Sequence, residues 1–489
     1  MKKKKVLLTI LAIIAGVVLL ISLLNFYAKQ RVEDQLSKLE APVEYTSLGV
    51  NVITNNFSLS DLKTRQATFA LSARKMNFRG LSYYKFLFKD QLVIDEIEME
   101  EPSIRYFSKD SVSKDTSQKR NFTVKSFLLK NGDFSRSNSD TSEVTFFVSF
   151  PEIEVKGVEN FRTPDFKSYR ADIDSVYLKM NAQHYIQIGN IEAKNGRVQL
   201  LDFGILPFYS KEVFDQKIEI EKDRISLEVD SIFMENFAVE KLRDTLLLSD
   251  SKMTVSHAIL EIYRNKLVKD DVRRKPLYNE LLRKAPVKLN FKQVLVENSE
   301  IIYEEQVQES RQPAIIRFTD VSAEINNLNN LSSIEIPQPK ITARANFMRG
   351  TPVNLSWTFP VFDMDNSFSI SGSFGSLEGE ALDPFLVPAL DLQARGEIND
   401  IHFNFSGNEN ILSGDFKMNY DDLKVELLKK EGKEKKGFFS AIANLFVENK
   451  GEARAEEKQI EVERNKERSF WNFVWLGLRQ GFLNTVSQL

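Results

Sequence analysis

Apolar and polar residues alternate with a period of two along most of this chain. Between Val287 and Leu328 the apolar residues Leu289, Phe291 and Leu295 fall on alternate positions, with polar residues between them. Side chains two residues apart in a strand lie on the same face of the sheet. The pattern therefore predicts β-strands with one apolar and one polar face.

Two breaks interrupt the alternation in this stretch. The polar run 297–300, Glu-Asn-Ser-Glu, predicts a turn. At Asp320 the apolar positions change phase, which indicates a β-bulge because one extra residue shifts the side chains that follow to the other face. We therefore predict three strands here, with a turn near 298 and a bulge near 320.

Similar segments recur elsewhere in the chain. Asn-Gly or Asn-Ser follows an apolar run at 131–132, 195–196 and 298–299, and Asn-Gly is the strongest short-range signal for a hairpin. A longer correspondence links 70–107 with 227–263, where a strand leads to a short connector and two further strands. The spacing is uneven, so we predict a loose repeat of hairpins without a fixed period.

Only one segment is apolar for long enough to span a membrane. Four lysines precede an apolar run of 22 residues from Val6 to Tyr27, and a helix of that length crosses a bilayer core of about 30 Å. A cleaved signal peptide is the alternative, but the end of the run lacks a small-x-small cleavage pattern. We therefore predict a retained anchor. Its representative residues are Val6, Ala12, Val18, Leu24 and Tyr27.

The charges around this run predict its orientation. The lysines lie before the apolar run, whereas Lys29 and Arg31 after it are balanced by Glu33 and Asp34. This bias places the N-terminus in the cytoplasm and the bulk of the chain outside it. The predicted parts are 1–28, a cytoplasmic tip and anchor; 29–428, a repeating β region; and 429–489, a charged turn, terminal strands and an amphipathic helix.

Few other helices are expected. Residues 276–285 open with proline and are followed by Pro286, which predicts a short helix. The segment 469–489 carries apolar residues at helical spacing. Trp471, Trp475 and Phe482 make it a candidate helix at a membrane interface. The interpretation that we prefer is a helix that covers the last open edge of a sheet.

The strands of the second half supply candidate residues for a binding face. A sheet with one apolar face must close on itself, pack on a second sheet, or leave that face for a ligand. If the face takes a ligand, the residues that we expect to line it are Phe291, Leu295, Phe368, Ile370, Phe403, Phe405, Phe416 and Met418.

Composition excludes several other functions. The chain has 66 Lys and Arg against 69 Asp and Glu, so its overall charge does not favour binding of nucleic acid. Cysteine is absent, which removes disulfides, thiolate metal sites and cysteine nucleophiles. His184, His257 and His402 are far apart and have no metal-ligand spacing. We expect no enzyme activity, no metal and no cofactor.

Taken together, these segments resemble a known family. Residues 80–107, GLSYYKFLFKDQLVIDEIEMEEPSIRYF, the pair NSEIIYEE and RFTDVSAEINNL at 298–305 and 317–328, and YDDLKVELL at 420–428 are similar to AsmA-like envelope proteins. The N-terminal anchor and the Trp-rich terminus extend this resemblance over the chain. It implies a Gram-negative inner-membrane protein with a mostly β fold, whose periplasmic part is an elongated, curved antiparallel β-sheet groove with an apolar inside and a few short helices. This chain is short for that family.

The resemblance implies a function in the cell envelope. We expect an inner-membrane protein that binds phospholipid in its apolar groove and supports lipid transport to, or assembly of, the outer membrane. The expected partners are phospholipid or another acyl lipid, the inner membrane, and outer-membrane or other envelope proteins. The alternative is a scaffold or adaptor that transports nothing and has a closed β core, because period-two alternation predicts both.

Overall fold

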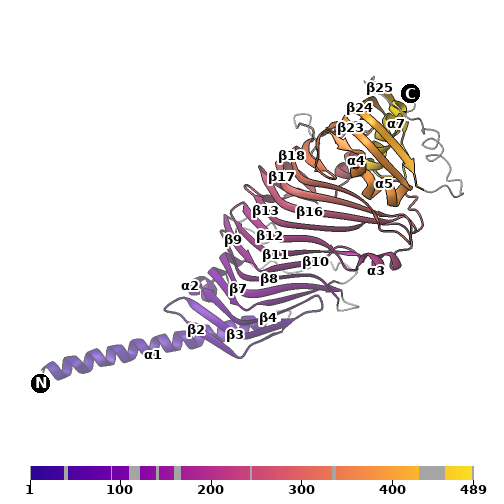
Figure 1. The fold of residues 1–489 in the computed structure, drawn as a ribbon. Coiled ribbons are helices and arrows are strands. Elements are labelled where there is room, and N and C mark those ends of the chain that lie inside the picture. Colours follow the sequence, from indigo (N-terminus) through magenta and orange to yellow (C-terminus); the bar gives the residue numbers. More distant parts are fainter. Residues whose placement is uncertain are drawn as a thin grey trace. The chain divides into compact units, whose positions relative to one another are not determined.

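The structure is a computed structural model that describes residues 2–37, 42–89, 91–108, 122–138, 143–158, 167–242, 245–332, 337–428 and 457–486. The described residues are mostly β, with one long N-terminal helix and a few short helices (Figure 1). The predicted mostly β fold is therefore confirmed. Residues 429–456, which include the predicted charged turn, lie outside the described residues.

The chain divides into two compact units. Unit 1 comprises Met1–Lys179 and Ile186–Asn195. Its elements are α1 (Lys2–Ser37), β1 (Val43–Glu44), β2 (Ser47–Asn51), β3 (Asn56–Arg65), β4 (Phe69–Arg79), α2 (Tyr83–Phe88), β5 (Leu92–Glu100), β6 (Ser103–Ser108), β7 (Phe122–Asn138), β8 (Val144–Lys156), β9 (Ser168–Ile173), β10 (Ser175–Lys179) and most of β11 (His184–Lys194).

Unit 2 comprises Met180–Tyr185 and Gly196–Leu489. Its elements are β12 (Arg197–Pro207), α3 (Lys211–Gln216), β13 (Arg224–Met234), β14 (Ala238–Leu242), β15 (Thr245–Asp250), β16 (Met253–Asn265), α4 (Tyr278–Arg283), β17 (Lys288–Gln306), β18 (Ala314–Asn329), β19 (Lys340–Phe347), β20 (Thr351–Thr358), β21 (Phe368–Phe374), β22 (Leu377–Glu378), the 3₁₀ helix η1 (Gly379–Leu382), α5 (Asp383–Leu390), β23 (Leu392–Gly407), β24 (Ile411–Leu427), β25 (Lys458–Glu463) and α7 (Phe470–Val486). The boundary between the units falls inside the range 29–428 that we predicted as one β region.

Neighbouring strands among the described residues are mostly antiparallel, but each unit contains a parallel junction. In unit 1, β4 pairs antiparallel with β5 and β6, and both of these run parallel to β7. In unit 2, β15 and β16 run parallel to β17, and β16 pairs antiparallel with β13. The predicted correspondence between 70–107 and 227–263 is therefore a repeat of this arrangement. The parallel pairing itself was not predicted.

The three Asn-containing dipeptides have different roles. Asn195 and Gly196 form the turn between β11 and β12, as predicted. Asn131 and Asn298 lie inside β7 and β17, with left-handed φ of 53° and 49°. The hairpin prediction is wrong at these two places, because the left-handed conformation that asparagine tolerates also occurs within a strand, and near Asn298 it accompanies a bulge.

The bulge predicted at Asp320 is confirmed. Asp320 has a φ of 51°, and the pairing of β18 with β19 shifts register between Thr319 and Ser322. The turn predicted at 297–300 is instead a second bulge, where the pairing of β17 with β18 shifts register on both sides of Ser299. β17 is therefore one continuous strand of 19 residues.

The predicted helices at 276–285 and 469–489 correspond to α4 and α7. Helices α2, α3 and α5 were not predicted, since the first two are only six residues long and too short to show a periodic pattern. Helix α1 continues past the predicted anchor end at 28, because Ala28 and Val32 pack into the hydrophobic core of unit 1.

Candidate apolar binding face

The strand register of unit 2 separates two faces of its sheet. One row of paired positions across the strands is apolar, and it contains Val198, Met234, Met253, Val294, Ile325, Ile341, Trp357, Ile370 and Phe405. The adjacent row is mostly polar, and it contains Thr254, Leu295, Glu324, Thr342, Ser356, Ser371, Asn404 and Asp415. Adjacent residues in a strand point to opposite sides. We call the side of the first row the inner face and the side of the second the outer face.

Helix α7 covers the inner face at the C-terminal end of unit 2. Its Gly477 lies against Phe405, and its Gly481 lies directly against the ring of Phe416 with no room for a side chain. Phe470 at the start of the helix stacks on Trp357, with 4.7 Å between ring centroids. Glycine permits this close approach because it has no Cβ. The inner face is therefore a closed hydrophobic core at this end.

Most of the residues that we expected to line a lipid groove lie in this closed core. They are Phe368, Ile370, Phe403, Phe405, Phe416 and Met418, and each is at most 6% exposed. The expectation that they form an open face is wrong, because α7 returns from the end of the chain to cover them. The pattern of a strand records only that one face is apolar and does not record what covers it.

The other two candidates on β17 are placed differently. Leu295 lies on the outer face, beside Glu297 and Glu324. It is therefore not part of the apolar row, which runs through its neighbour Val294. Phe291 is buried but does not belong to the core under α7.

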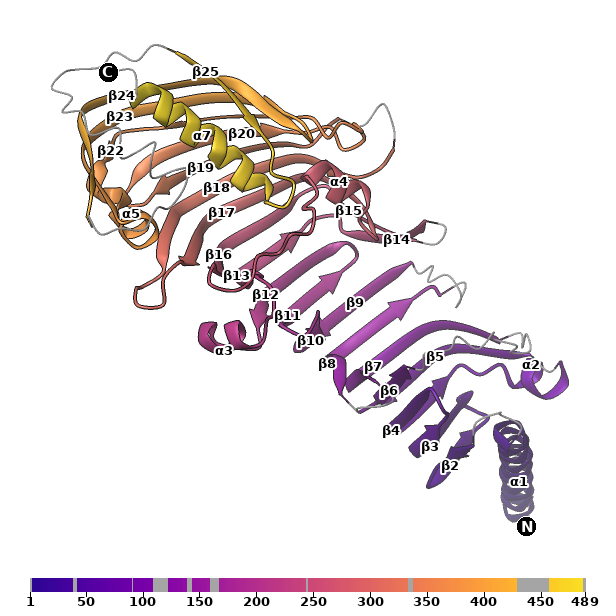
Figure 2. The ribbon, with the colours of Figure 1, turned by 90° about the vertical axis from the view of Figure 1, so that its right-hand side faces the viewer.

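Across β12, β13, β16, β17 and β18 the same inner face lies outside the core under α7. Figures 1 and 2 show these strands as a single layer. Two further apolar rows cross it. They contain Ile205, Leu227, Leu260, Ile301 and Phe318, and Ile225, Ile262, Tyr303 and Ile316. All nine residues are partly exposed, and none belongs to the core under α7. We call these nine residues the open rows.

A line of residues with left-handed φ separates the open rows from the rows that continue under α7. Asp202, His257, Asn298 and Asp320 have left-handed φ between 49° and 53°, and they lie at neighbouring positions in β12, β16, β17 and β18. A bulge increases the local bend and twist of a strand. Register shifts mark bulges at Asn298 in β17 and Asp320 in β18, so these two neighbouring strands bend at about the same level.

A charged connection spans the inner face. β16 and β17 are parallel, so residues 266–277 must run the length of these strands to return to α4 (Figure 2). This connection, which we call the strap, ends at Leu277, which is fully buried in the core under α7. The strap therefore lies on the inner face and leads from the open rows towards α7.

Ion pairs tie the strap to the segment that precedes α7. Glu221, which is buried, accepts from Lys266 of the strap at 3.1 Å and from Arg468 at 2.9 Å. Arg464, whose side chain is fully buried, lies 2.8 Å from Glu409, and burial lowers its pKa. Because these groups come from distant parts of the chain, they hold the strap and the start of α7 together.

The same network includes a strongly stabilised carboxylate in α4. Glu280 accepts hydrogen bonds from Arg274 and Lys284, and Arg274 also contacts Glu409 at 2.9 Å. The bonds from Arg274 and then Lys284 lower the pKa of Glu280 to about 2. Glu280 is therefore charged at any physiological pH, and the network holds α4 in place.

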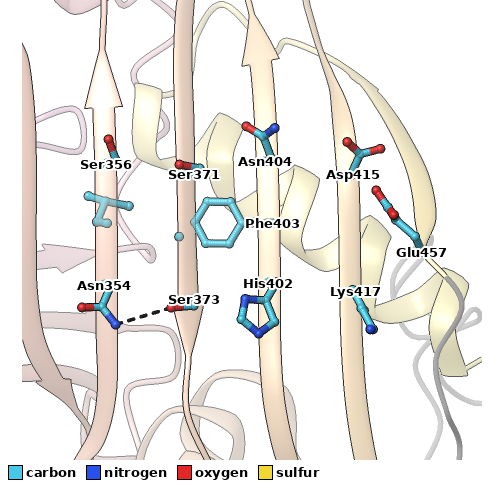
Figure 3. A pocket seen from close by; sticks show the side chains of 12 residues that line it. Asn354, Ser356, Ser371, Ser373, His402, Phe403, Asn404, Asp415, Lys417 and Glu457 are labelled. Carbon is cyan, nitrogen blue, oxygen red and sulfur yellow. Dashed lines mark hydrogen bonds between the residues drawn. The ribbon is translucent and has the colours of Figure 1, made fainter.

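The described residues of the outer face form shallow depressions with mixed polar and apolar linings. The larger, about 580 Å³, is lined by Asn354, Ser371, His402, Asn404 and Lys417 among others. Figure 3 shows these side chains on one side of the strands, with a helix on the other side. The smaller, about 520 Å³, includes Glu297 and Arg344. In both linings, polar side chains lie beside Leu355.

The histidines do not gather into a site. His184 is buried, and its Nε2 accepts a hydrogen bond from the backbone N–H of Ile225 at 3.0 Å, while burial lowers its pKa. His257 and His402 lie 3.7 and 3.4 Å from Asp230 and Asp400. Within the described ranges, no three His, Asp or Glu residues are arranged to hold a metal ion.

Helix α1 is long and apolar enough to cross a membrane. Val18, Leu24 and Tyr27 are exposed along it, as expected for side chains that meet lipid. The side chains of Val6 and Ala12 lie outside the described residues.

The three C-terminal interface candidates separate on α7. Trp471 and Trp475 are exposed, whereas Phe482 packs against the core under the helix. The preferred interpretation of this segment, a helix that covers the sheet, agrees with this packing, although α7 covers a face and not an edge.

Comparison with protein-family models gives no match, and a search of curated proteins gives no similar sequence.

Proposed function

We propose that this protein binds the acyl chains of phospholipid on the open rows of unit 2. The observation that supports this proposal is the contrast along one face. The inner face is closed by α7 at one end, whereas across β12 to β18 nine apolar residues remain partly exposed. Apolar rows that are continuous over several strands and remain partly exposed are suited to binding an apolar ligand.

Acyl chains are suited to lie on such apolar rows. Each CH₂ group that leaves water contributes about 0.8 kcal/mol and needs no directional partner. A chain can therefore lie across successive strands and move along the rows at little cost per step, while its headgroup remains in water. The open rows offer aliphatic and aromatic groups to a lipid chain. The one hydroxyl among them, that of Tyr303, donates a hydrogen bond to Glu305 and so has a partner within the protein.

The cellular setting is part of the same proposal. We infer an AsmA-like protein of the inner membrane, anchored by α1 with its N-terminus in the cytoplasm and its bulk in the periplasm. There it supports lipid transport to, or assembly of, the outer membrane, with outer-membrane or other envelope proteins as partners. An exposed apolar helix followed by an extended β region supports this inference.

Photo-crosslinking in cells tests the lipid contact. The photoreactive residue p-benzoylphenylalanine is placed at Leu260 in the open rows or at its neighbour Ile259, which is 48% exposed on the outer face. Both positions are aliphatic and lie on β16, so they differ mainly in the face that they occupy. We expect phospholipid adducts, identified by mass spectrometry, at 260 and not at 259. Equal adducts at the two positions, or none at 260, would reject the proposal.

The scaffold alternative is favoured by one observation. The core under α7 is fully closed, as a protein that only holds partners would require. If position 260 captures protein segments and no lipid, the strands serve as a scaffold and the rows are an interface with a partner protein.

A further inference from the structure

Three large apolar side chains are unusually exposed on unit 1, close to the end of α1. Ile53, in the turn between β2 and β3, and Tyr84 on α2 are each 66% exposed, and Phe88 on α2 is 71% exposed. Exposed groups of this size, gathered at one place, mark a contact with another apolar surface. The sequence resemblance and the open rows do not account for them.

Helix α2 has two chemically different sides. Tyr83 and Phe86 are buried in the core of unit 1. The other side exposes Tyr84 and Phe88, whose rings lie 5.8 Å apart, together with lysines at 85 and 89. Aromatic residues interleaved with lysines are typical of helices that lie in the interface of a membrane with anionic headgroups.

The contacts of α1 place this surface near the end of the apolar run. Asn25 of α1 accepts a hydrogen bond from the backbone N–H of Val52 at 2.8 Å, and Ile53 is the next residue. Ala28 and Val32 of α1 pack in the same core as the buried side of α2. At 1.5 Å per residue, Val32 is only about 10 Å beyond Asn25 along the helix. Figure 1 shows α2 and β2 beside this end of α1.

We propose that Ile53, Tyr84, Lys85, Phe88 and Lys89 form a membrane-contact patch that lies in the headgroup region of the bilayer that α1 spans. The patch holds unit 1 directly on the membrane surface. Its aromatic and aliphatic groups enter the interface, and its two lysines meet anionic headgroups. The proposal rests on the proposed function in one respect, namely that α1 crosses the membrane.

The absence of cysteine allows a direct test on the full chain. Single cysteines at Phe88, Tyr84, Val18 or Tyr106 are labelled with an environment-sensitive fluorophore. The proteins are reconstituted into vesicles of phosphatidylethanolamine with one quarter phosphatidylglycerol, and nitroxide-labelled lipid is added as a quencher. Tyr106 is the matched control, because it is an exposed aromatic residue of unit 1 that pairs with Phe69 at the far end of β4. That end is about 30 Å along β4 from Phe78, which lies at the end of the strand that leads to α2.

We expect quenching by headgroup-region nitroxide at 88 and 84 to be about threefold stronger than at 106, and quenching by nitroxide deep in the acyl chains to be strongest at 18. Quenching at 18 with none above the control at 88 and 84 would reject the patch and leave the anchor intact. No quenching at 18 would instead reject the anchoring on which the patch depends. Circular dichroism of each labelled protein establishes that the label has not unfolded unit 1.

Discussion

The contrast between the open rows and the closed core predicts that a change to aspartate destabilises the protein much less in the open rows than in the core. Leu260→Asp introduces a carboxylate that remains hydrated, because Leu260 is partly exposed. We expect it to lower the free energy of unfolding by about 1–2 kcal/mol, from lost β preference and apolar contact. Phe405→Asp buries a charge at a fully buried position. The cavity alone costs about 3–5 kcal/mol, and the unpaired charge adds to this.

The effect on lipid follows from the same position. Contact of a leucine with an acyl chain is worth about 1.5–3 kcal/mol, and a carboxylate beside hydrocarbon costs about 2.5–3.5 kcal/mol. Together these come to about 4 kcal/mol or more, and each 1.4 kcal/mol is tenfold in affinity. Leu260→Asp should therefore weaken lipid binding at this strand about a thousandfold while the protein stays folded.

The assay uses a reporter beside the substitution. The photoreactive residue at Ile301, which pairs with Leu260, reports lipid adducts in the Leu260→Asp protein, and Ile259→Asp on the opposite face is the control. All three tryptophans lie in unit 2, so tryptophan fluorescence follows its unfolding. If both variants retain equal adducts, the open rows do not bind lipid. If Phe405→Asp remains folded, α7 does not close the core.

Three further predictions concern the packing of α7 and the ion pairs of Glu409 and Glu280. Gly481→Leu should displace α7 from Phe416 and destabilise unit 2 by about 3 kcal/mol, seen as faster proteolysis of the C-terminus; unchanged proteolysis would contradict the packing. Glu409→Gln leaves the buried Arg464 without a charged partner and should cost about 3 kcal/mol, and a denaturation midpoint equal to wild type would show that the pair contributes nothing. Because the folded pKa of Glu280 is about 2 against an ordinary 4.5, its contribution is complete above pH 4.5 and is lost as pH falls towards 2. Glu280→Gln should flatten that fall in the denaturation midpoint, and an unchanged pH slope would refute the assignment.

The local elements can be recognised from the amino-acid sequence. Alternation of apolar and polar residues gave the strands, because side chains in a strand have a period of two whatever surrounds them. The length of the apolar run gave α1, and the phase change at Asp320 located a bulge. These features depend on neighbouring residues only, so they can be recognised from the chain without a structure.

Pairing and cover were decided by the tertiary structure. Asn195 makes a turn and Asn298 a bulge, although both follow similar apolar runs, because the difference lies in which strand pairs with the next. Phe405 and Leu260 look alike in sequence, each apolar on an alternating strand. One is closed by α7, which comes much later in the chain, and the other is left partly exposed. A period of two records which face is apolar, whereas what lies over that face depends on contacts between distant segments.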